Sequence, residues 1–397
     1  MSQETLPPKL VGSGEGKNSL ESISHENLRR LSAQAVAECK GRGGKVIGYT
    51  CTYVPEEIVY AAGMFPLRIF GGAEDTFKGE ELLQVNLCSF VRSCMGEALE
   101  GNYDFLDGLV MARVCSHTTK LYDVWELYLS PSLTHIIDQP HRISDRACSF
   151  YAGELQKFVS ALERAGGKKV TAENLREAVR LCNESRSLLR ELYEFRKEEP
   201  PRISGSKSLQ MVRASQLLPK KQGNALLKKV LTDLRERGEI SRRSDRPRLL
   251  LTGSVIDNLA FVEAVEEAGA DVVCDDLCVG SRSFWDLVEI APGGYPIEAL
   301  SRHYVEKIPC PHIHPQEHRF QHILEMARHF HAQGAIIFNV KFCDTSIFGS
   351  PGCIELLRQE GIPSLELEIE HSTVALGQIR TRVQAFLEML KGARQET

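Results

Sequence analysis

The segment Gly334–Cys343 is the most apolar strand candidate in the chain, and it constrains the fold more than any other stretch. Residues Ala335–Phe342 follow a glycine and are rich in β-branched and aromatic side chains, which predicts a buried strand. The next residues, Asp344–Gly352, predict a loop, and a helix is expected from Ile354. Because open α/β sheets bind ligands beyond the carboxyl ends of their strands, the Cys343 thiol is a candidate functional group.

Two further thiols occupy comparable positions. Leu106–Cys115 is a second apolar run that ends in cysteine, and polar residues then lead into a helical stretch. Cys88 comes just before a helix that is predicted to begin near Val91. Iron–sulfur clusters are held by thiolates, usually four. These three thiols are dispersed along the chain, so the pattern alone leaves both a cluster site in a cleft and buried inert thiols open.

The order of the predicted elements indicates the fold class. A strand at 45–50, a helix at 55–63 and a strand at 65–70 form a unit that implies parallel pairing. A mostly helical stretch follows, and after Pro247 a second series of strands and helices begins. The predicted fold is therefore α/β, with two parallel-sheet lobes joined by a helical segment. We expect an N-terminal arm and helix (1–44), a first α/β lobe (45–150), a helical connecting region (151–246) and a second α/β lobe (247–397).

Composition narrows the functional classes. The 397 residues carry a net charge of −5 and include twelve cysteines, without the dense spacing of a secreted disulfide scaffold. We find no signal peptide and no run near the roughly 18 apolar residues of a membrane span, so a cytoplasmic protein without a membrane partner is expected. A basic stretch at 219–248 lacks aromatic residues, which argues against nucleic acid.

Several weaker motifs need separate treatment. Gly44-Lys45 is followed by Val46 and precedes a strand, and no GxGxxG is present, so neither ATP nor NAD is expected to bind directly. His318 and His322 have a spacing that can bind zinc, although a solvated helix face or hydrogen bonding near the cleft is favoured.

Two adjacent carboxylates are candidate catalytic groups. Glu56 and Glu57 open a predicted helix, where they would favour the positive end of the helix dipole. The alternative is proton handling near a thioester, for which a buried cleft could adjust their pKa.

Separated blocks of the sequence closely resemble one family, the catalytic-component subunits of 2-hydroxyacyl-CoA dehydratases and benzoyl-CoA reductases. The resemblance runs in order from about residue 40 to 392 and is poorest across the helical middle. The blocks are Thr50–Gly63, Cys88–Ser93, Lys341–Asp344, Gly361–Glu368 and Gly377–Phe386.

The resemblance implies two Rossmann-like (flavodoxin-like) lobes around a 4Fe–4S cluster held by Cys88, Cys115 and Cys343. It also implies an acyl-CoA substrate, a related subunit or second copy as partner, and a separate ATP-dependent iron–sulfur activator that supplies one electron. Such dehydratases expel hydroxide from a 2-hydroxyacyl-CoA through a ketyl radical, and the reductases dearomatise benzoyl-CoA.

The sequence also departs from the family pattern. The family often has Asp after the second cysteine, whereas Ser116 and His117 follow Cys115 here, which bears on the hydrogen bonds that tune a cluster. Additional cysteines, among them Cys51 and Cys353 as possible extra ligands, exceed the basic three. A related group of the family carries a double-cubane cluster and has no assigned acyl-CoA substrate, so an electron-transfer protein of that kind is an alternative. A structural paralogue without a cluster is a third.

Overall fold

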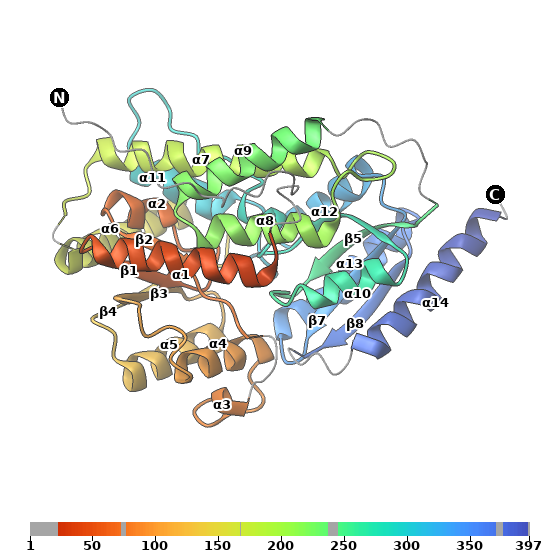
Figure 1. Cartoon of the computed structure of the whole chain (residues 1–397), viewed down its shortest axis with the longest axis horizontal. Helices are drawn as coiled ribbons and strands as arrows, with labels where there is room; N and C mark the ends of the chain where they lie inside the picture. Colours follow the sequence, from red (N-terminus) through yellow and green to blue (C-terminus); the bar gives the residue numbers. More distant parts are fainter. Residues whose placement is uncertain (1–22, 73–76, 167, 237–244, 371–375, 396–397) are drawn as a thin grey trace.

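The computed structural model describes residues 23–72, 77–166, 168–236, 245–370 and 376–395. It shows two four-stranded sheets, each entirely parallel, with helices packed around both (Figure 1). The predicted α/β class, with two Rossmann-like parallel-sheet lobes, is confirmed. The predicted N-terminal arm lies outside the described residues.

The first sheet has the strand order β2–β1–β3–β4. All residues of its first three strands are buried, in keeping with their short apolar sequences. The crossover from β1 to β2 is helix α2 (Glu56–Ala61), after which Gly63 turns the chain with a φ of 74°. The strands are β1 (Val46–Tyr49), β2 (Phe65–Arg68), β3 (Gly108–Ala112) and β4 (Leu133–Ile137).

The second sheet repeats this order as β6–β5–β7–β8. In both sheets the first strand in the chain lies between the second and the third, so the strand order reverses between β1 and β3 and between β5 and β7. The carboxyl edge at such a reversal is where doubly wound sheets bind ligands. The strands are β5 (Arg248–Gly253), β6 (Asp271–Asp276), β7 (Gly334–Val340) and β8 (Ser364–Ile369).

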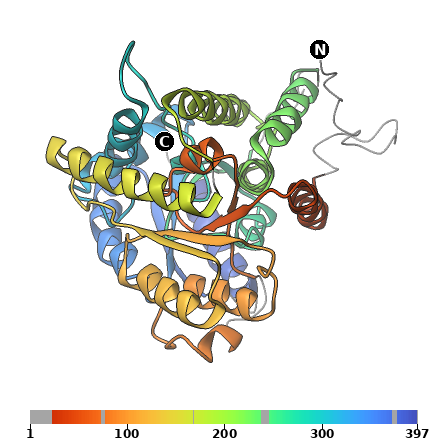
Figure 2. The ribbon, with the colours of Figure 1, turned by 90° about the vertical axis from the view of Figure 1, so that its left-hand side faces the viewer.

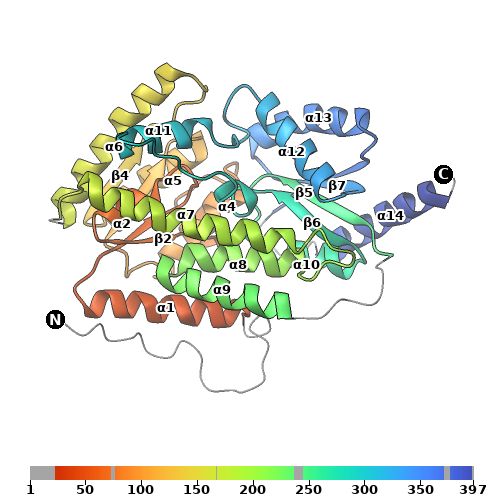
Figure 3. The same ribbon diagram turned by 90° about the horizontal axis from the view of Figure 1, so that it is seen from above.

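Helices cover both faces of the first sheet. In Figure 2, α4 and α5 lie on one face of this sheet and α6 lies on the other. Figure 3 shows α1, α7, α8 and α9 as neighbouring helices of one layer. The helices are α1 (His25–Gly41), α3 (Phe77–Glu80), α4 (Ser89–Leu99), α5 (Ser116–Leu129), α6 (Asp145–Gly166), α7 (Ala172–Glu194), α8 (Gly205–Leu217) and α9 (Lys220–Glu236).

The second lobe contributes one helix to the core of the first. Leu300 and Tyr304 of α11 pack among the buried side chains beneath the first sheet. A separate apolar cluster also includes Leu109 of β3 and Leu249 of β5, so the lobes share core. The helical elements here are α10 (Ala260–Glu267), the 3₁₀ turn η1 (Ser281–Ser283), α11 (Pro296–Glu306), α12 (Glu317–His329), α13 (Asp344–Gln359) and α14 (Leu376–Gln395).

One predicted loop is a helix. The loop expected over Asp344–Gly352 is the first half of α13, which contains Pro351. Tertiary hydrogen bonds oppose the poor helix propensity of this stretch. The hydroxyls of Ser346 and Ser350 both bond to the side chain of Asn339 in β7, with Ser346 Oγ 2.8 Å from the Asn339 amide oxygen.

Helices of the described ranges are all too short or too polar to cross a bilayer.

Candidate functional site: a thiol centre between the sheets

Four cysteines follow strands, and each lies near the carboxyl edge of its sheet. Cys51 follows β1 and Cys115 follows β3, so they flank the order reversal of the first sheet. Cys278 follows β6 and Cys343 follows β7 in the second sheet. The parallel strands therefore bring thiols from both lobes toward the space between the two sheets.

Two more cysteines reach the same place without following a strand directly. Cys88 is the N-cap residue of α4, and Cys310 lies in the connection between α11 and α12. We use the term thiol centre for the group of six: Cys51, Cys88, Cys115, Cys278, Cys310 and Cys343.

The electrostatic influence of these thiols on one another shows that they converge. Burial raises the pKa of Cys88, and the charges of Cys343 and Cys115 raise it further. Burial likewise raises the pKa of Cys51 to about 12, with contributions from Cys310 and Cys278. Cys310 also acts on Cys343, which joins the two groups into one cluster.

His312 connects two of the thiols. Its Nδ1 lies 3.3 Å from the Cys310 sulfur. Burial raises the pKa of Cys310, but the charge and hydrogen bonds of His312 outweigh burial and lower it to about 6. His312 also hydrogen-bonds to Cys115 and lowers the pKa of that thiol against the effect of burial. At neutral pH, His312 therefore provides positive charge for two sulfurs.

Two buried arginines provide further positive charge. Arg68, the last residue of β2, donates from Nη1 to the Cys278 carbonyl oxygen at 3.0 Å, and its Nη2 lies 3.8 Å from the Cys278 sulfur. Arg282 is held by Asp276 at 3.2 Å, and among the described residues its Nη1 has no hydrogen-bond partner. Since the charges of Cys310 and Cys278 act on Arg282, this free donor lies beside the thiol centre. The surroundings suit an anionic sulfur-rich group.

The departure from the family pattern after Cys115 has a structural counterpart. The Nδ1 atom of His117 accepts a hydrogen bond from the backbone N–H of Cys88 at 3.2 Å. Burial lowers the pKa of His117, which keeps the ring neutral and able to accept this bond. His117 thus ties the α5 N-terminus to the α4 N-terminus.

The thiol centre is accessible from one side. A surface hollow of ≈ 420 Å³ is lined by Cys115, Lys120 and His141, among other residues. Beside Cys343, the non-glycine residue Phe342 has a φ of 67°, which is an unusual conformation for a bulky side chain. Strained residues of this kind are concentrated at functional sites.

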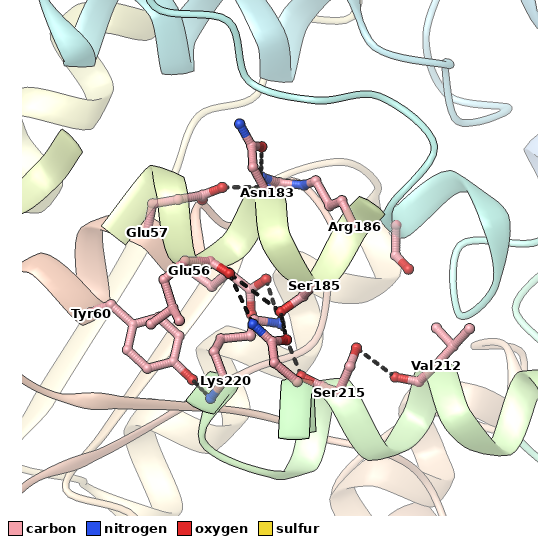
Figure 4. Close-up of polar contacts among 12 residues, drawn as sticks. Glu56, Glu57, Tyr60, Asn183, Ser185, Arg186, Val212, Ser215 and Lys220 are labelled. Atoms are coloured by element: carbon pink, nitrogen blue, oxygen red, sulfur yellow. Dashed lines mark hydrogen bonds and ion pairs between the residues drawn. The ribbon is translucent and has the colours of Figure 1, made fainter. Parts of the chain in front are cut away.

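Glu56 and Glu57 have different partners (Figure 4). Glu57 is fully buried, and its carboxylate accepts from Arg186 at 2.6 Å and from the Tyr304 hydroxyl at 2.8 Å. Burial raises the pKa of Glu57, but the Arg186 charge and the hydrogen bonds outweigh burial and lower it. Glu56 pairs with Lys220 at 2.8 Å, and its side chain is 17% exposed.

Cys353 lies apart from the thiol centre. It is on α13, where it packs among apolar residues beneath the second sheet. Burial raises its pKa to about 11, and the charged groups that act on it are Arg319 and Asp276. Across the described ranges, no three side chains of His, Cys, Asp or Glu are arranged to hold a single metal ion.

Comparison with known proteins identifies the family. A family model described as 2-hydroxyglutaryl-CoA dehydratase, D-component, matches residues 51–390. The chain belongs to this family. One of the subunits of the benzoyl-CoA reductase of Thauera aromatica, the one designated C, is 27% identical over 355 residues, which cover 87% of this chain and 91% of that protein.

Two dehydratase subunits are similarly related. The (R)-phenyllactyl-CoA dehydratase beta subunit of Clostridium sporogenes is 26% identical, with 88% of this chain and 92% of that protein covered. The beta subunit of the (R)-2-hydroxyglutaryl-CoA dehydratase of Acidaminococcus fermentans is 24% identical, with 92% and 98% covered. This member of the dehydratase family is accordingly an enzyme subunit of the dehydratase/reductase type.

Sequence reasoning missed several residues at the thiol centre of this family member. Cys278 follows a predicted strand, so the rule that selected Cys115 and Cys343 would also have selected it. Arg68 ends a strand in the same way. Cys310 and His312 lie in a connection between helices, where no sequence signal indicates which way the chain runs.

Proposed function

We propose that this chain is the iron–sulfur subunit of a 2-hydroxyacyl-CoA dehydratase or benzoyl-CoA reductase-type enzyme, with Cys88, Cys115 and Cys343 holding a 4Fe–4S cluster. The main support is that Cys343 and Cys115, far from Cys88 in the chain, both act on its pKa. A single metal ion requires sulfurs within about 4 Å of each other, given bonds of about 2.3 Å. A four-iron cube separates its thiolates further, so the lack of a single-ion group among the described residues is compatible with a cube.

The donor set also suits such a group. The thiolates and inorganic sulfides of a cluster are anionic, and the buried donor of Arg282 and the charge of His312 would stabilise them. When bound, a cluster of this type supplies single electrons at low potential to an acyl-CoA thioester. His117 and Arg68 would hold the Cys88 and Cys278 backbones in place.

The partners follow from the same proposal. The relatives are named as subunits of reductases and dehydratases, so we expect this chain to pair with a related subunit or with a second copy. An ATP-dependent iron–sulfur activator would deliver the electron, and the setting would be the cytoplasm. The acyl-CoA would approach through the hollow beside Cys115.

Anaerobic reconstitution tests the proposal. The protein is loaded with iron and sulfide, its iron is measured, and electron paramagnetic resonance spectra of the reduced protein are recorded with and without 2-hydroxyacyl-CoA and benzoyl-CoA esters. We expect about four irons per chain and a spectrum that changes with one class of ester. A colourless, iron-free product would reject the proposal.

One observation favours a second candidate, a double-cubane electron-transfer protein of the same family without an acyl-CoA substrate. The thiol centre contains six cysteines, and Cys51, Cys278 and Cys310 act on one another or on shared neighbours. Three thiolates for each of two linked cubes would use all six. About twice the iron of a single cube, with a spectrum unchanged by acyl-CoA esters, would support this candidate.

A further inference from the structure

A small polar chamber lies between the helical layer and the thiol centre. Its volume is ≈ 30 Å³, which is room for about two water molecules. Its lining includes Glu56 of α2, Arg68 of β2 and Gln216 of α8. Polar side chains from three elements thus meet in one enclosed space.

Two polar atoms of the lining need partners. Among the described residues, Gln216 Oε1 and Arg68 Nε have no hydrogen-bond partner, although the two residues are only 5% and 2% exposed. Buried polar atoms are nearly always hydrogen-bonded to protein or to ordered water. A water molecule in this chamber could serve both atoms.

The chamber adjoins the thiol centre on one side. Arg68 lines it with part of its guanidinium and extends Nη2 to 3.8 Å from the Cys278 sulfur. Thr52, the next residue after Cys51, is also part of the lining. The chamber is therefore separated from the thiols by one layer of side chains.

Glu56 connects the chamber to solvent on the other side. Its carboxylate is 2.8 Å from Lys220 Nζ and 3.4 Å from the Tyr49 hydroxyl, and 17% of the side chain is exposed (Figure 4). Glu57 has no comparable access, because it is fully buried against Arg186 and Tyr304. Of the two carboxylates, only Glu56 borders both the chamber and solvent.

We propose that the chamber holds water and that Glu56 relays protons through it from solvent to the thiol centre. This inference rests on the proposed iron–sulfur function, since electron uptake there creates a demand for protons. In each cycle one proton leaves the Glu56 carboxyl for a chamber water and one returns to it from solvent. No electron moves in this step, and the proton passed on compensates the charge that reduction adds.

The charged and titratable groups around Glu56 come from five elements. Lys220 of α9 is its ion-pair partner, and the remaining groups are those on whose pKa the Glu56 charge acts. They are Tyr49 of β1, Tyr60 of α2, Cys182 and Arg186 of α7, and Tyr304 of α11.

Proton uptake during reduction tests the relay. Reconstituted protein is reduced with dithionite in a weakly buffered solution, and a pH-indicator dye reports proton uptake in a stopped-flow instrument. We expect Glu56→Gln to slow proton uptake about a hundredfold while leaving iron content unchanged. Gln216→Leu, which fills the chamber with an apolar side chain, should slow uptake as well.

A matched control and an iron-independent measurement complete the test. Glu191→Gln removes a carboxylate from an exposed ion pair with Arg235 on the outside of α7 and should leave proton uptake unchanged. Normal iron content with unchanged uptake in Glu56→Gln and Gln216→Leu would overturn the relay alone. Failure of the wild-type protein to bind iron would overturn the proposed function and the relay with it. A crystal structure of the iron-free protein should show ordered water between Gln216 and Arg68, and a dry chamber would also overturn the relay.

Discussion

The Nδ1 atom of His312 lies 3.3 Å from the sulfur of Cys310, and its Nε2 lies 2.7 Å from the Thr345 hydroxyl oxygen. Burial lowers the pKa of His312, but the charge of Cys310 outweighs burial and raises it to about 11. The pKa of Cys310 is lowered to about 6 by the same pairing. Near neutral pH, the iron-free protein therefore contains a thiolate–imidazolium pair between its two lobes.

This pair makes Cys310 unusually reactive toward electrophiles. Because the thiolate is the nucleophile, Cys310 of the iron-free protein should be alkylated by iodoacetamide nearly as fast at pH 7 as at pH 8. His312→Gln removes the positive charge and should slow the reaction at pH 7 at least about tenfold. Mass spectrometry of the Cys310 peptide over a time course measures both rates, with Cys148 as an internal comparison whose pKa is raised by burial. Equal rates in the two proteins would contradict the ion pair.

Glu57 is predicted to act through stability. Glu57→Gln leaves Arg186 buried without its ionic partner, which should lower the free energy of unfolding by about 3–5 kcal/mol. Replacing both residues, as Glu57→Gln with Arg186→Met, should recover part of this loss because no unpaired charge remains. Urea denaturation followed by circular dichroism gives the comparison, and Glu177→Gln, in an exposed pair with Arg180, is the matched control. A Glu57→Gln protein as stable as the wild type would show that the pair is dispensable.

The sheets could be predicted from sequence because their strands are short apolar runs set off by glycine, proline or polar residues. The strand predicted to end near Cys343 is β7, which ends at Val340. The first half of α13 was predicted wrongly because Pro351 and nearby glycines indicate a loop. The Asn339–Ser346 and Asn339–Ser350 bonds that favour the helix are tertiary contacts, which local sequence does not reveal.

The site shows a similar division. Thiols at strand ends could be selected from sequence because parallel strands bring their carboxyl ends to one edge. Cys353 was selected only because it was an additional cysteine, and it lies within a helix that faces an apolar core. Arg68 and Arg282 could not be selected, because nothing in their local sequence shows that an arginine will be buried beside sulfur.

Cys343 and Cys353 provide a matched pair for iron binding. Cys343→Ser should lose most of the bound iron after reconstitution, because it removes one of the three proposed ligands. Cys353→Ser should keep its iron, since that thiol packs with apolar residues and its charged neighbours are Arg319 and Asp276. Iron content per folded chain, normalised by circular dichroism, distinguishes the two variants. Equal iron loss in both would contradict the assignment of ligands.

Lys307 should produce a stability change at alkaline pH. It donates to the Thr52 carbonyl oxygen at 2.8 Å and lies over the Tyr53 ring, and burial lowers its pKa to about 8. In the unfolded chain the pKa of lysine is about 10.4, so between about pH 8 and 10.4 the unfolded state binds more protons than the folded state. The free energy of unfolding should therefore rise with pH across this window, by up to about 3 kcal/mol from this group. Below pH 8 the lysine is charged in both states, and its contribution no longer changes with pH.

Comparison with Lys307→Met isolates this contribution, since the other titrating groups are common to both proteins. Urea denaturation of the iron-free proteins under reducing conditions at several pH values from 7 to 10 gives the two curves. The difference between wild type and Lys307→Met should grow in favour of the wild type as pH increases through about 8. A difference that stays constant over the range would mean that the lysine keeps an ordinary pKa in the folded protein.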